Sequence, residues 1–221
     1  MQRIVKGMPD YAEFLIVIFV CFGSPIATSL WVFFLEPGFI GKSDFSNLEA
    51  LELLIFEVVA LATTLLFLEM RGWSLDVFRF EITWGSTLAA PLMVVGLLFT
   101  MILLQGQFGT VQGDAGAPVR VAEVSLFTAF VASVFNPIFE EVIVVAYVMN
   151  FIAARYGPIA GVAASAGIRL IYHLYQGYAA FFALLPMGIL FGLIYWRWRN
   201  LWPLILAHGI WNFLPVLFSG S

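Results

Sequence analysis

Long apolar stretches, separated by short polar ones, run along the whole chain. The stretches cover about 11–35, 48–68, 83–105, 124–154, 157–177, 178–196 and 202–218. Most are close to the roughly 20 apolar residues that an α-helix needs to cross a bilayer. The pattern predicts an all-α fold, a polytopic transmembrane helix bundle of about seven spans, with six to eight as the range.

Three features interrupt this simple pattern. Gly, Ser and Pro at 23–25 predict a kink in the first stretch, and 124–154 is too long for a plain span. Aromatic and charged residues alternate in 71–81, which predicts a short amphipathic segment at the membrane interface. A Gly-rich loop is expected at 106–123.

Composition supports a membrane protein. Hydrophobic residues make up 62% of the 221 residues and charged residues only 11%, whereas a soluble domain has about 25% charged residues. We therefore expect a single integral membrane domain over 1–221, with a motif-bearing core at 124–218. A net charge of −4 without a basic run argues against nucleic acid as a partner. Cys21 is the one cysteine, which excludes a disulfide framework.

The basic residues predict the orientation. One set of span ends carries most of them: Arg3, Lys6, Arg71, Arg79, Arg155, Arg197 and Arg199. The opposite ends carry only Lys42 and Arg120. Because Lys and Arg concentrate on the cytoplasmic side, we expect a cytoplasmic N-terminus in a multi-pass protein of the plasma (inner) membrane.

Two adjacent acids, Glu140 and Glu141, stand inside the apolar run 125–154. A central acidic residue costs roughly 2.5–3.5 kcal/mol on insertion scales, so the pair requires a reason. Helical neighbours point about 100° apart, so Glu140 shares a face with Asn136 while Glu141 needs a partner on another helix. Pro137 predicts a kink beside them.

Two later apolar stretches repeat this spacing of polar residues. Arg169 and His173 lie four residues apart, as do His208 and Asn212, and we expect each couple to share one helix face. Together with the Asn–Glu couple, three helices each offer two polar side chains. The sequence therefore predicts a functional site within the membrane.

The residue types indicate hydrolysis by water. A buried carboxylate beside a His can activate water, and a second His with an Asn can stabilise an oxyanion. No Ser or Cys with its own paired base stands out, so water is expected to attack the peptide carbonyl directly. Alternatively, Glu140, His173 and His208 are three ligands of a catalytic zinc with an open fourth position. The two chemistries need the same residue types.

Several other polar residues in the spans have a structural interpretation. A single intramembrane His is often a hydrogen bonder between helices. We interpret the remaining candidates as structural, packing or interface residues: Glu52, Glu57, Tyr172, Tyr175 and Gln176.

The three couples resemble the motifs of the CAAX protease and bacteriocin-processing family, CPBP or Abi. This family includes CAAX prenyl protease 2 and proteins like lysostaphin resistance protein A. Its motifs are Glu-Glu-x-x-x-Arg, Phe-x-x-x-His and His-x-x-x-Asn/Asp, and the matching segments here are 140–145, 169–173 and 208–212. The resemblance covers roughly 50–215, most specifically 136–213.

Two positions depart from these motifs. Val145 stands in place of the Arg of the first motif, and Arg169 stands in place of the Phe of the second. We hypothesise that Arg169 supplies the missing charge and pairs with Glu141 or Glu140 across the helix interface. The chain then resembles a divergent bacterial-type member.

The resemblance implies an intramembrane endopeptidase that cleaves a membrane-associated peptide or protein, with the bilayer and that substrate as its partners. It also implies residue roles, and we favour the glutamate-type assignment without a cofactor over the zinc alternative. On that view the catalytic residues are Glu140 as base, His173 as its partner, and His208 with Asn212 for the oxyanion. The supporting residues are Glu141, Arg169 and Asn136.

Two other functions stay open at this point. A non-proteolytic immunity or scaffold protein would retain the family fold without cleavage. An ion- or proton-coupled transporter would use Glu57, Glu140 and Arg169, but transporters of that kind usually show two related halves. No internal repeat is visible in the sequence.

Overall fold

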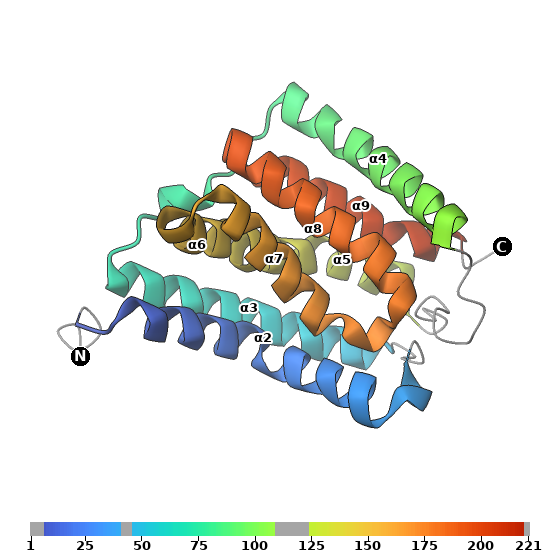
Figure 1. The fold of residues 1–221 in the computed structure, drawn as a ribbon, viewed down its shortest axis with the longest axis horizontal. Helices are drawn as coiled ribbons and strands as arrows, with labels where there is room; N and C mark the ends of the chain where they lie inside the picture. Colours follow the sequence, from blue (N-terminus) through green and yellow to red (C-terminus); the bar gives the residue numbers. More distant parts are fainter. Residues whose placement is uncertain (1–6, 41–45, 109–123, 219–221) are drawn as a thin grey trace.

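The computed structural model describes residues 7–40, 46–108 and 124–218 (Figure 1). These residues form helices and no strand, so the all-α prediction is confirmed. The α-helices are α2 (Asp10–Leu35), α3 (Asn47–Arg71), α4 (Trp84–Phe108), α5 (Leu126–Glu140), α6 (Val148–Tyr156), α7 (Pro158–Tyr172), α8 (Tyr178–Trp198) and α9 (Trp202–Phe218). Shorter turns are the 3₁₀ helices η1 (Pro37–Phe39), η2 (Leu75–Phe78) and η4 (Leu174–Gln176), and the π-helix η3 (Glu141–Tyr147). The predicted loop at 106–123 lies almost wholly outside the described residues.

Local sequence signals fix the helix ends. Ser46 caps α3 in a capping box, in which it exchanges hydrogen bonds with Glu49. Ser125 caps α5 by accepting from the amide of Thr128 at 3.1 Å. A left-handed Gly157 (φ 86°) ends α6, and the next residue, a proline, begins α7.

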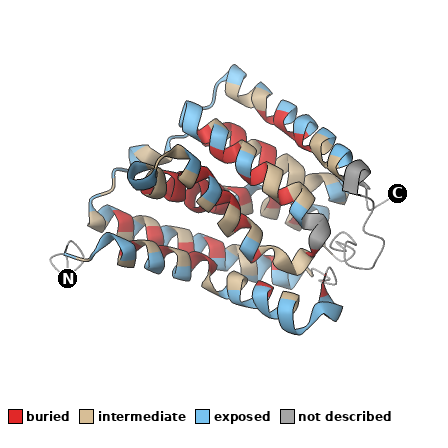
Figure 2. Cartoon of the chain, in the orientation of Figure 1, coloured by how far each residue is buried: buried red, intermediate tan, exposed pale blue. Residues whose placement is uncertain are grey.

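The helices form a multi-pass membrane bundle. Among the described residues, five helical segments are long and apolar enough to cross a membrane: Asp10–Leu35, Asn47–Arg71, Trp84–Leu104, Leu126–Tyr156 and Phe181–Trp198. The other two apolar helices, α7 and α9, are shorter. Outer helices expose large apolar side chains such as Phe19 and Trp84, which suits contact with lipid. Buried residues concentrate in the central helices (Figure 2).

The longest apolar stretch forms the centre of the bundle. Helix α5 continues through Pro137, and the winding changes at Glu141, where η3 begins. All seven residues of η3 are buried. A π-helix of this length is rare, and such helices are frequent at functional sites. The stretch that is too long for a plain span therefore changes helical pitch at the second glutamate, whereas the kink expected at Pro137 stays a prediction.

The amphipathic segment after α3 is tied to the bundle by a buried acid. Glu13 of α2 accepts hydrogen bonds from Arg71 Nε at 2.6 Å, Trp73 Nε1 at 2.9 Å and the Tyr147 hydroxyl at 3.3 Å. The segment contains only the short helix η2. Trp73 therefore turns into the protein and helps to fix the end of η3.

Small residues allow the central helices to approach closely. A methyl group placed on Gly209 of α9 would lie 2.6 Å from the Ser133 carbonyl oxygen of α5. One placed on Gly188 of α8 would lie 2.8 Å from Ala166 Cα of α7. Such contacts are typical of helix packing in membranes, and they bring α5, α7 and α9 into reach of one another.

We expect Gly188→Ala to lower the thermal unfolding midpoint in detergent. The added methyl group would overlap α7, and overpacking of this kind typically costs about 1–3 kcal/mol. Gly167→Ala is the matched control, because nothing lies within 4 Å of that position and alanine favours helix. Equal midpoints for the two variants would contradict the close α7–α8 contact.

Candidate functional site

One cavity gathers the four predicted catalytic side chains. It has a volume of about 430 Å³ and is lined by Glu140, His173, His208 and Asn212. These residues come from α5, the end of α7, and α9, and α3 contributes the opposite wall. The three motif segments therefore meet in space, as the spacing of the polar couples predicted.

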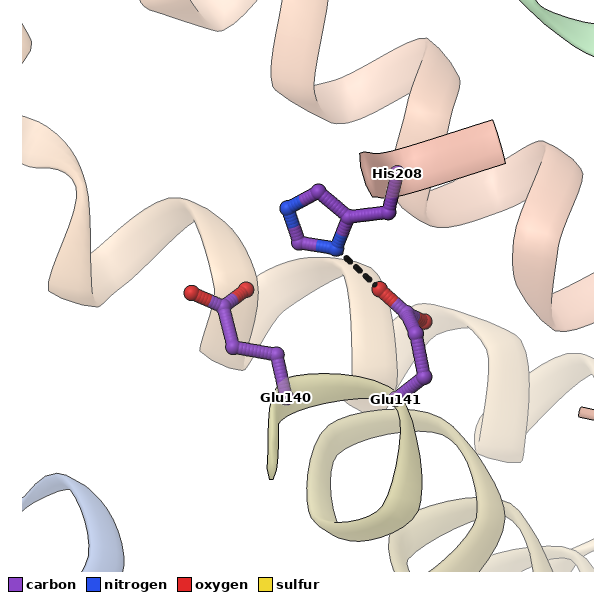
Figure 3. A group of neighbouring side chains, drawn as sticks. All are labelled: Glu140, Glu141 and His208. Carbon is purple, nitrogen blue, oxygen red and sulfur yellow. Dashed lines mark hydrogen bonds and ion pairs between the residues drawn. The ribbon is translucent and has the colours of Figure 1, made fainter. Parts of the chain in front are cut away.

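The two adjacent glutamates point in different directions. Glu140 lines the cavity and is 5% exposed, whereas Glu141 is fully buried and does not line it. Figure 3 shows their carboxylates pointing apart. The expected angle of about 100° between helical neighbours accounts for this difference.

Arg169 bridges the two glutamates from α7. Its guanidinium lies 3.1 Å from Glu140 Oε2 and 2.7 Å from Glu141 Oε1, and its side chain is fully buried. The ion pair hypothesised from the sequence is thus present, with contacts to both acids. Val145, at the motif position of Arg, is buried inside η3. The guanidinium of Arg169, from the neighbouring helix α7, therefore supplies the positive charge that Val145 cannot.

His208 is held by Glu141. Its Nδ1 lies 2.6 Å from Glu141 Oε1 (Figure 3). An ionised carboxylate only accepts hydrogen bonds, so Nδ1 carries the hydrogen in this contact. The second ring nitrogen, Nε2, remains for a ligand in the cavity.

His173 is held by the backbone instead. The sequence predicted that Arg169 and His173 share one helix face, and the structure makes His173 the C-cap residue that follows Tyr172 at the end of α7. The His173 amide donates to the Leu170 carbonyl, which tightens the last turn, and its Nδ1 lies 3.0 Å from the Arg169 carbonyl oxygen. A carbonyl only accepts, so Nε2 is again the free nitrogen.

Asn136 joins three helices at the cavity wall. Its Nδ2 donates to Glu140 Oε1 at 3.1 Å and to Glu57 Oε1 at 2.6 Å. Its Oδ1 accepts from Asn212 Nδ2 at 3.0 Å. The predicted i, i+4 couple is therefore a hydrogen bond, and the same amide orients Asn212.

The sequence interpretation missed two residues of the site. The Tyr172 hydroxyl donates to Glu140 Oε2 at 2.5 Å, and its ring stacks on Phe22. Glu57 lines the cavity and accepts from Asn136 Nδ2. Glu57 lies in the middle of its span, so inserting it into the membrane costs as much free energy as inserting Glu140. The sequence therefore contained a reason to include Glu57 among the site residues. No pattern in the sequence distinguishes Tyr172 from a packing residue.

A metal would meet a mixed set of groups here. In the described part of the chain, Glu140, Glu141 and His208 offer ligand atoms within 4.8 Å of one another, which differs from the zinc set expected from the sequence. Carboxylate and imidazole suit zinc, but Arg169 donates to both carboxylates. Glu141 Oε2 and Arg169 Nε are both buried without a hydrogen-bond partner. Because the positive charge of Arg169 lies within 3.1 Å of Glu140 and 2.7 Å of Glu141 and would repel a cation, the set fits a guanidinium better than a dication.

Comparison with known proteins agrees with the family resemblance. Residues 122–214 match the family model described as type II CAAX prenyl endopeptidase Rce1-like. The match extends from just before α5 into α9 and includes the three motif segments. No curated protein and no solved structure matches the chain.

Arg169→Ala is expected to destabilise the protein strongly. Removing one partner of a buried ion pair typically costs about 3–5 kcal/mol, because the other charges stay buried. Glu141→Ala should cause a loss of similar size, measured as the thermal unfolding midpoint in detergent.

The exposed Arg197 of α8 supplies the control, and Arg197→Ala should leave the midpoint near that of the wild type. An Arg169→Ala protein as stable and as active as the control would refute the charge-balancing role.

Proposed function

We propose that the chain is an intramembrane endopeptidase, because residues 122–214 belong to the Rce1-like family of type II CAAX prenyl endopeptidases. It would hydrolyse a peptide bond of a membrane-associated peptide or protein. The observation that supports this most is the convergence of Glu140, His173, His208 and Asn212 on one cavity inside an apolar bundle.

Glu140 is the proposed base. Arg169, Tyr172 and Asn136 all donate to its carboxylate, which holds the group as an oriented anion at the cavity wall. A water molecule between Glu140 and His173 Nε2 would attack the peptide carbonyl carbon with its oxygen, and the Glu140 carboxylate would take one of the protons of that water. The proton then passes to the leaving amine nitrogen as the C–N bond breaks.

His208 and Asn212 are the proposed donors to the oxyanion. Glu141, 2.6 Å from His208 Nδ1, fixes the orientation of the ring, and a proton on Nε2 would be donated to the oxyanion. One amide hydrogen of Asn212 goes to Asn136, and the other is free for the substrate oxygen. Two donors fixed before the reaction stabilise charge that develops in the transition state.

The proposed mechanism uses no metal. Arg169 already neutralises one of the two glutamate charges. Each proposed proton transfer has a side chain that accepts or donates the proton. A zinc-dependent peptidase is the second candidate, and the cluster of Glu140, Glu141 and His208 is the observation that favours it. We further propose the plasma membrane as the location, with the N-terminus cytoplasmic.

Glu140→Gln is expected to abolish cleavage while the protein stays folded. The amide keeps the shape of the side chain but cannot take the proton, and general base catalysis typically contributes about 10²–10⁴-fold in rate. The measurement is cleavage of a peptide library by purified protein. Unchanged gel-filtration and unfolding profiles are the control for folding. Cleavage at the wild-type rate would exclude Glu140 as the base, and an intact biological phenotype would favour a scaffold.

A chelator should leave the cleavage rate of the wild type unchanged. Incubation with a strong zinc chelator, followed by dialysis and the same peptide assay, tests this directly. If the chelator abolishes cleavage and added zinc restores it, the zinc-dependent mechanism is supported instead.

A further inference from the structure

Glu57 brings a second carboxylate to the cavity, beside that of Glu140, from outside the matched family segment. It comes from α3, is 3% exposed and lines the cavity wall. Its Oε1 accepts from Asn136 Nδ2 at 2.6 Å, and the same nitrogen donates to Glu140 Oε1 at 3.1 Å. The two carboxylate oxygens can therefore be no farther apart than these two distances together. Glu57 thus lies beside the proposed base.

Among the described residues that line the cavity there is neither Lys nor Arg to balance this acid. In the described residues Arg169 forms ion pairs with Glu140 and Glu141, whereas Glu57 forms none. A buried carboxylate without a cation is costly, so a positively charged ligand would gain strongly from binding here.

The approach to Glu57 is also acidic. A second crevice, of about 600 Å³, lies between α2 and α3 and shares Leu53 and Tyr175 with the cavity. Glu49 and Glu52 line this crevice, and its lining has no Lys or Arg within the part of the chain that the structure describes. Carboxylates thus follow α3 from its exposed first turns to the buried Glu57. Clefts lined by one sign of charge concentrate ligands of the opposite sign.

We propose that Glu57 determines specificity by binding a cationic side chain, lysine or arginine, next to the scissile bond of the peptide substrate. This rests on the proposed peptidase function. Apolar wall residues such as Leu54 and Trp211 suit the aliphatic stem of such a side chain. The carboxylate accepts hydrogen bonds from its charged end, and the peptide is held with its carbonyl near Glu140.

The test uses matched peptides based on one sequence that the wild type cleaves. They differ only in Lys, Gln or Glu at the position beside the bond. We expect the wild type to favour Lys over Gln about tenfold or more in kcat/KM, mainly through KM. Glu57→Gln should remove the preference, and Glu57→Lys should shift it toward the Glu peptide.

Glu69→Gln is the matched control, since Glu69 lies exposed on the same helix, away from the cavity. It should keep the wild-type preference. Thermal unfolding of each variant shows whether it is folded, and Glu57→Gln alone is sufficient if Glu57→Lys does not fold. An unchanged Lys preference in folded Glu57→Gln would overturn the proposal.

A binding experiment separates this proposal from the peptidase function. Protein carrying Glu140→Gln is immobilised and equilibrated with a random peptide library, and the bound peptides are sequenced by mass spectrometry. Enrichment of Lys and Arg that disappears on adding Glu57→Gln supports the subsite even if the wild type cleaves nothing. Absence of enrichment, together with cleavage that ignores charge, refutes the subsite while the peptidase stands.

Discussion

The buried contact of Arg169 with two glutamates is the interaction on which the site depends. Two carboxylates on successive residues of a central helix would repel each other and oppose burial. The guanidinium neutralises one charge and contacts both acids, and His208 contacts the same Glu141 oxygen as Arg169, Oε1. Polar groups from three helices are thereby locked together in an apolar bundle. The same contacts that make burial possible also direct Glu140 into the cavity.

The two glutamates differ in what they contact. Glu141 has no surface in the cavity and contacts only protein groups, so its role is to hold Arg169 and His208. Glu140 keeps a face toward the cavity. The transition to π-helical winding begins between them, and η3 continues as a fully buried segment. A change of pitch at this point alters how the following turns pack without disturbing the polar face that precedes it.

The sequence allowed the bundle and most of the site to be predicted. Apolar length identified the helices, and spacing of four placed Asn136 with Glu140 on one face. The departures at Val145 and Arg169 suggested the ion pair that the structure contains. Three features depended on tertiary packing instead. His173 is the C-cap residue of α7, the Tyr172 hydroxyl donates to Glu140, and Glu57 accepts from Asn136 although the two residues are far apart in the sequence.

Helix α7 is shorter than the membrane is thick, and this bears on how its last turn is completed. Its 15 residues span only about 22 Å, against about 30 Å for the hydrocarbon core of a bilayer. The last turn of any helix leaves carbonyl groups without intrahelical partners, and in lipid such groups are costly. Here His173 meets two of them, because its amide donates to the Leu170 carbonyl and its Nδ1 to the Arg169 carbonyl oxygen. The short helix thus makes one imidazole both the closure of its own backbone and a part of the cavity wall.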